Sequence, residues 1–200
     1  RSGAARPAPE TLERREVERL LPGGAVHQGL ALLADDLPRT SLEAFCRQGG
    51  GSPAVVLDQA TDPRNVGAVL RAAAAFGAGA VVVHARGSPQ ATGALAKAAS
   101  GALEKVPLVR AANIVRAMEA LKDAGYWCLG LDAGAAATIA EAGVSGRLAL
   151  VLGSEGGGLR RLTRQTCDLV ARIPTTDRMD SLNLSTAAAI ALYQLARPDD

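Results

Sequence analysis

Short, continuous apolar runs separated by stretches of helical periodicity constrain the fold of this 200-residue chain more than any other feature. These runs are rich in Val, Leu and Ala, and they occupy residues 54–58, 80–84, 126–131, 148–152 and 169–173. We expect helices in the intervals, at about 63–76, 90–99, 111–124 and 159–166, and a last helix over 184–197. Apolar strands joined by helical crossovers form a mainly parallel sheet with helices on both faces, so the predicted fold class is α/β.

Composition excludes several classes of function. Hydrophobic residues make up 48% of the chain but aromatic residues only 2%, which disfavours RNA recognition by stacked aromatic platforms. The formal net charge of +2 predicts no strongly basic surface. No apolar run approaches the roughly 20 residues of a membrane span, so we expect no membrane partner. Three cysteines without a CxxC pair favour a reducing, cytoplasmic location, and we interpret Cys128 and Cys167 as core residues.

A stretch rich in Gly, Ser and Pro divides the chain near residues 49–53. Before it, the sequence ETLERREVERLL predicts a short charged helix that ends at a Pro-Gly-Gly turn. Behind it, strands and helices alternate without interruption. We therefore expect a main domain at residues 51–200, preceded by a separate segment at residues 1–50.

Several common motifs are absent from the sequence. There is no GxxxxGK[ST], no GxSxG and no HExxH, and no GxGxxG opens a helix after the first strand. The missing GxGxxG disfavours a nucleotide-binding oxidoreductase, which the α/β pattern alone would allow. His27 and His84 are far apart in the sequence, so we expect no metal site, and we interpret His84 as structural or solvated.

The first segment with chemical potential follows the first strand, where the sequence reads DPRNVGAVLRAA. Asn65 stands near the start of the expected helix and could simply cap it. Gly67 stands between Arg64 and Arg71 on the polar side, where glycine costs about 1 kcal/mol relative to alanine. We therefore expect something to approach the helix closely at Gly67.

Two more polar loops follow later strands. Gly153 and Glu155 belong to the sequence LVLGSEGGGL, in which glycines let the backbone approach a ligand. Ser181, Leu182 and Asn183 precede the last helix, in the sequence SLNLS. Taken singly, the first loop also fits an ordinary turn and the second a helix cap.

Three arginines form a basic row, GLRRLTRQ, directly after the glycine-rich loop. Arg160, Arg161 and Arg164 fit either a solvated helix face or a phosphate-binding edge. The sequence leaves both interpretations open.

Taken together, the three polar segments closely resemble the three motifs of the SpoU (TrmH) family of RNA ribose 2′-O-methyltransferases, within the SPOUT superfamily. The resemblance runs from about residue 54 to residue 197, nearly three quarters of the chain. Within the family, the chain most resembles the bacterial branch that modifies large-subunit rRNA. The residues that match, in motif order, are Asn65, Gly67 and Arg71; Gly153, Glu155, Gly156 and Gly158; and Ile173, Pro174, Ser181, Leu182, Asn183 and Ser185.

The resemblance implies a cofactor and roles for these residues. The methyl donor is S-adenosylmethionine, held in a deep C-terminal trefoil knot that general topology rules would have excluded. By resemblance, Gly153, Ile173 and Leu182 bind the cofactor. Arg71 would position an RNA phosphate and ease deprotonation of the ribose 2′-hydroxyl, and Gly67 would leave room for the RNA backbone. The remaining catalytic candidates, which would orient the substrate and complete the pocket, are Asn65, Glu155, Ser181 and Asn183.

The implied function is methylation of a ribose 2′-hydroxyl, on a guanosine of 23S rRNA. A tRNA-directed member of the family and a non-catalytic RNA-binding relative remain as alternatives. The resemblance also implies a homodimer. Residues 1–50 would be the tail of an N-terminal RNA-binding domain similar to ribosomal protein L30e, together with its linker.

Overall fold

The computed structural model describes residues 8–48, 51–176, 178 and 181–196. Its contacts divide the chain into two compact units, Arg1–Leu37 and Pro38–Asp200. The first unit contains helix α1 (Arg14–Arg19), where Glu13 and Glu16 form a capping box, so the predicted charged helix is confirmed. The origin of residues 1–50 as the tail of an L30e-like domain stays a prediction.

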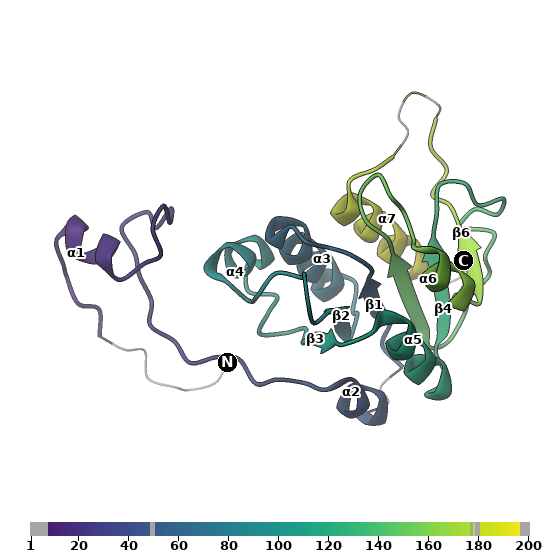
Figure 1. Cartoon of the computed structure of the whole chain (residues 1–200), viewed down its shortest axis with the longest axis horizontal. Helices are drawn as coiled ribbons and strands as arrows, with labels where there is room; N and C mark the ends of the chain where they lie inside the picture. The colour runs from purple at the N-terminus through teal and green to yellow at the C-terminus, as the bar shows by residue number, and fades with distance from the viewer. Residues whose placement is uncertain (1–7, 49–50, 177, 179–180, 197–200) are drawn as a thin grey trace. The chain divides into compact units, whose positions relative to one another are not determined.

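The second unit is built on a six-stranded parallel sheet with the strand order β3-β2-β1-β5-β4-β6 (Figure 1). The strands are β1 (Ala54–Leu57), β2 (Ala80–His84), β3 (Leu108–Ala111), β4 (Trp127–Leu131), β5 (Leu148–Leu152) and β6 (Leu169–Ala171). The edge strand β3 was not predicted, because its four residues follow a proline and include Arg110, so they form no continuous apolar run. The other five strands and the α/β class are confirmed.

Helices cover both faces of the sheet, as predicted. Val55 and Leu57 point to one core with α3 (Pro63–Ala75), α4 (Gly93–Ala99) and α7 (Leu184–Ala196). The alternate residues Ala54 and Val56 point to a second core with α2 (Leu42–Gln48) and α5 (Ile114–Asp123), beside which α6 (Arg161–Thr166) lies. Burial on both faces explains why the strands lack polar alternation. The C-terminal trefoil knot is consistent with this strand order and stays a prediction.

Gly67 serves the packing of two helices. A Cβ atom on Gly67 would lie 2.6 Å from Ala98 Cβ, 2.7 Å from the Leu95 carbonyl oxygen and 2.9 Å from the Ala99 nitrogen. The missing side chain therefore lets α3 and α4 approach each other. Gly67 is buried while Arg64 and Arg71 are exposed, so the expectation that Gly67 leaves room for an RNA backbone is wrong.

Gly67→Ala is expected to lower the free energy of unfolding by about 1–3 kcal/mol, because its Cβ collides with the backbone of α4. Urea denaturation would measure the loss. Gly93→Ala is the matched control in α4, because a Cβ there meets nothing within 4 Å and alanine favours a helix. An unchanged transition midpoint for Gly67→Ala would contradict this account of the close approach.

Candidate active site

Loops at the carboxyl ends of the strands surround a cavity of about 330 Å³. Ligands of open parallel sheets bind at this edge, because the connecting loops and helix N-termini gather there. The walls come from the segments after β4, β5 and β6 and from the start of α7. The lining residues are 131–133, 152–158, Ile173, Thr175, Ser181, Leu182, Leu184 and Ala187.

The cavity brings together all three residues predicted to bind the cofactor. Gly153, Ile173 and Leu182 come from three different segments and line it. Of the predicted catalytic residues, Glu155 and Ser181 also line the cavity. Asn65 and Asn183 are joined to it through hydrogen bonds to Glu155.

The Glu155 carboxylate links the three sequence motifs. Its Oε1 atom accepts hydrogen bonds from Asn65 Nδ2 at 2.9 Å, from Asn183 Nδ2 at 2.5 Å and from the Leu184 backbone N–H at 3.1 Å. Asn183 Nδ2 also lies 3.1 Å from Asn65 Oδ1. Three hydrogen-bond donors, at the starts of α3 and α7, therefore fix the Glu155 carboxylate, which belongs to the glycine-rich loop.

The two asparagines differ in whether they cap a helix. At the start of α3, Asp62 Oδ1 accepts from the Arg64 N–H at 2.8 Å, so Asp62 is the cap and Asn65 is left to bind Glu155. At the start of α7, Asn183 Oδ1 accepts from the Ser185 N–H at 2.9 Å, while its Nδ2 donates to Glu155. The capping interpretation was therefore wrong for Asn65 and correct for Asn183.

Arg71 lies apart from the Glu155 cluster. It follows Asn65 by six residues on α3, which places its Cα about 9 Å further along the helix axis. Its side chain is exposed and makes no hydrogen bond or ion pair within the described part of the chain. Glu155 is thus held by asparagine amides and a backbone N–H, and the Arg71 guanidinium is free to meet an external anion.

The glycine-rich loop folds back on itself beside the cavity. Ser154 and Gly158 exchange backbone hydrogen bonds of 3.1 and 3.0 Å. A Cβ on Gly153 would lie 2.0 Å from the backbone carbonyl carbon and oxygen of Gly158, and Gly158 itself has a φ of +62°. A side chain does not fit at Gly153, and the left-handed φ of Gly158 favours glycine, so backbone atoms form this wall of the cavity.

Sequence reasoning missed the wall that follows β4. Leu131, Asp132 and Ala133 line the cavity, as does Thr175 after β6. Asp132 accepts a 2.8 Å hydrogen bond from the Gly134 N–H and forms an ion pair with Arg164. The signal was available, because a strand was predicted to end at residue 131 and ligand loops follow strand ends.

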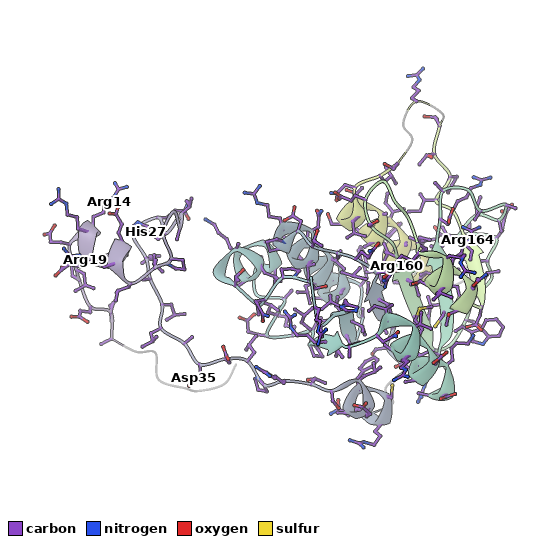
Figure 2. The ribbon with its side chains drawn as sticks, viewed as in Figure 1. Arg14, Arg19, His27, Asp35, Arg160 and Arg164 are labelled. Carbon is purple, nitrogen blue, oxygen red and sulfur yellow. The ribbon has the colours of Figure 1, made fainter. Side chains whose placement is uncertain are left out.

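The three arginines of the basic row after the glycine-rich loop lie in different environments, and Figure 2 labels two of them, Arg160 and Arg164. Arg160 Nε donates to Asp58 Oδ2 at 3.0 Å, and a second contact joins Arg160 Nη2 to Asp58 Oδ1. This hydrogen bonding raises the pKa of the Arg160 guanidinium. Arg164 pairs with Asp132, whereas Arg161 is exposed and has no partner among the described residues. Arg160 and Arg164 are thus exposed arginines held by ion pairs, and Arg161 still fits either interpretation of the row.

The other titratable candidates have structural surroundings. Burial raises the pKa of Cys128 to about 12 and that of Cys167 to about 11, as suits thiols packed in a core. His84 Nδ1 contacts the backbone N and O atoms of Arg86, at 3.0 and 2.7 Å. Across the described residues, no cluster of His, Cys, Asp or Glu is arranged to hold a metal ion, and no helix has the length and apolarity to cross a membrane.

Comparison with known proteins gives consistent matches. The model of the SpoU rRNA Methylase family matches residues 52–193. The 23S rRNA (guanosine-2′-O-)-methyltransferase RlmB of Vibrio cholerae is 42% identical over 177 residues, which cover 87% of this chain and 72% of that protein. RlmB from Burkholderia sp is 42% identical over 179 residues, with 88% and 72% covered.

Solved structures match the fold as well. SpoU methyltransferase AviRb from Streptomyces viridochromogenes, in complex with the cofactor AdoMet, has a TM-score of 0.67 at 27% identity and covers 73% of this chain. An AdoMet-bound rRNA methyltransferase from Sinorhizobium meliloti has a TM-score of 0.72 at 26% identity and covers 79%. The chain described here spans 60% of the length of each of these two solved chains.

Proposed function

Because this chain belongs to the SpoU rRNA methylase family, we propose that it transfers a methyl group from S-adenosylmethionine to a ribose 2′-hydroxyl of RNA, on a guanosine of 23S rRNA. The observation that carries the proposal is the Glu155 cluster at the mouth of the glycine-lined cavity. Transfer of a group between two bound molecules requires that both are held next to each other. A cavity for the donor beside a fixed polar cluster meets this requirement.

The cavity has the chemistry of a site for this donor. When bound, S-adenosylmethionine supplies an electrophilic methyl group on a sulfonium sulfur. Gly153, Ile173 and Leu182 would hold it, largely through backbone atoms, because the loop from 153 to 158 presents few side chains. Leu131 and Leu152 add apolar lining at the strand ends. This mixture of apolar walls and a few polar groups is typical of cofactor sites.

The predicted catalytic residues, in the cavity lining and next to it, would act on the RNA. Glu155 keeps the amides of Asn65 and Asn183 in one orientation, so that the three groups together position the target ribose. Ser181 would contribute its hydroxyl at the cavity wall. Arg71 would hold an RNA phosphate beside the 2′-hydroxyl, where the phosphate can accept a hydrogen bond from that hydroxyl as its proton leaves.

The proposal extends to assembly and location. Ile190 and Tyr193 on α7 are 38% and 54% exposed, and large apolar groups on an outer helix face can be buried by a second copy of the chain. We therefore propose a homodimer, which light scattering of the purified chain would detect as a doubled mass. We also propose a cytoplasmic location, which follows from the proposed rRNA substrate.

Calorimetric titration with S-adenosylmethionine is the first test, with NADH as the control ligand. Selective binding of S-adenosylmethionine, followed by transfer of a labelled methyl group to a 23S rRNA transcript and no transfer to a tRNA transcript, would support the proposal. Transfer to the tRNA transcript alone would show that the substrate is tRNA and not rRNA. A folded chain that binds RNA but no donor would be a non-catalytic relative.

A further inference from the structure

A second cavity, of about 350 Å³, lies at the carboxyl ends of β2 and β3. His84 and residues 113–115 form one side, and residues 160–163 form the other. The donor cavity is lined by residues 153–158 of the same chain segment, so a single stretch borders both cavities. Gly158 and Arg160 are two residues apart, and their Cα atoms are therefore at most about 7 Å apart.

Arg160 is held rigidly at this second cavity. The Asp58 side chain that binds it is fully buried at the end of β1, and Thr163 Oγ1 donates to the same carboxylate at 2.7 Å. The two hydrogen bonds from Arg160 to Asp58 use two of the five N–H donors of a guanidinium. Three donors remain for a ligand, on a side chain that is 46% exposed and lines the cavity.

The rest of the lining also favours an anion. Arg161 lines the cavity, is exposed and has no partner among the described residues. Asn113 caps the ten-residue helix α5, so the first backbone N–H groups of α5 lie at the same wall. Within the described lining there is no Asp or Glu to compete for these donors.

We propose that the second cavity binds a backbone phosphate of the substrate RNA, a few nucleotides from the ribose held at the donor cavity. The inference rests on the proposed function, because that function makes RNA the polymer that is bound. Arg160 and Arg161 supply the positive charge that a phosphate requires. Phosphate contacts of this kind fix the register of a nucleic acid on a protein without reading its sequence. The glycine-rich segment would thus hold the donor through 153–158 and the substrate strand through 160–163.

Arg161→Ala in the full chain is the sharpest test, because Arg161 has no intramolecular role to lose. The probe is a fluorescently labelled single-stranded RNA of ten nucleotides, whose dissociation constant is measured over a series of KCl concentrations. We expect the variant to bind ~5–10-fold more weakly at low salt and the slope of log K against log[salt] to fall by about 0.7, the value for one phosphate on a single strand. Arg161→Lys should restore the slope, since it keeps the charge.

Arg47→Ala is the matched control, because Arg47 is an exposed arginine on α2, which precedes the amino end of β1. It should leave the slope unchanged. Arg160 is left intact, because its removal would leave the Asp58 carboxylate buried and unpaired.

An unchanged slope in both Arg161→Ala and Arg161→Glu would overturn the inference, as would a complete lack of RNA binding by the unaltered chain. Titration of each variant with S-adenosylmethionine separates this result from the proposed function. If the chain bound S-adenosylmethionine and the salt slope of the variants were unchanged, only the proposed phosphate site would be contradicted. If the salt slope fell but the chain bound no S-adenosylmethionine, the phosphate site would be supported and the proposed methyl transfer would be contradicted.

Discussion

The Arg71→Ala variant is expected to lose methyl transfer by about a hundredfold to a thousandfold while binding S-adenosylmethionine as tightly as the unaltered chain. Arg71 is exposed on α3 and does not line the donor cavity, so its removal leaves the donor contacts in place. Its proposed partner, a phosphate beside the reacting hydroxyl, is present only when RNA is bound. Loss of one preorganised group that stabilises the transition state typically has an effect of this size.

Initial rates of methyl transfer to a 23S rRNA transcript, together with calorimetry of the donor, would measure both halves of the expectation. Arg64→Ala provides the control, because Arg64 is an exposed arginine on the same helix whose backbone N–H, and not its side chain, contacts the Asp62 cap. If Arg71→Ala turned over at the same rate as Arg64→Ala, Arg71 would have no part in the reaction.

Gly153→Ala is expected to reduce the affinity for S-adenosylmethionine by at least about a hundredfold. The added Cβ would lie 2.0 Å from backbone atoms of Gly158, so the fold-back of the loop must open by more than an ångström. The backbone atoms of Gly158 cannot rotate away from the added Cβ as a flexible side chain could. The loop would therefore shift, and the cavity wall that it forms would shift too. Calorimetric titration with the donor would measure the loss.

Gly157→Ala in the same loop separates this collision from a general intolerance of side chains. Its Cβ would meet only Ser154 Oγ, at 2.7 Å, and that hydroxyl can rotate away. Near-UV circular dichroism of both variants would show whether the domain is still folded. Full donor affinity in a folded Gly153→Ala chain would refute the account of the loop as the donor cradle.

The patterns that were read correctly are local ones. Continuous apolar runs predicted five strands, and the second and third motifs supplied Gly153, Ile173 and Leu182, which line one cavity. Gly67 was misread because Arg64 and Arg71 suggested a polar side of α3. The helix is in fact buried by two neighbours, α4 and α7, so its buried arc is wider than one apolar stripe.

Contacts between distant residues account for the remaining errors. Arg160 looked like one of three equivalent arginines, and its buried partner Asp58 lies 102 residues earlier in the chain. No spacing rule connects the two. The hydrogen-bond partners of Glu155 likewise could not be predicted, because Asn65 and Leu184 lie 90 and 29 residues away. Only the parallel sheet, which gathers strand ends at one edge, brings such residues into contact.

The three hydrogen bonds to Glu155 also set an order of events during protein synthesis. Two of the donors, Asn183 Nδ2 and the Leu184 N–H, belong to the start of the last helix, which ends at residue 196. A nascent chain that already carries Asn65 and the glycine-rich loop still lacks two of the three donors that anchor the carboxylate. The Glu155 cluster can therefore form only after the start of α7 has left the ribosome, and a chain that is terminated before residue 183 lacks two of the three donors.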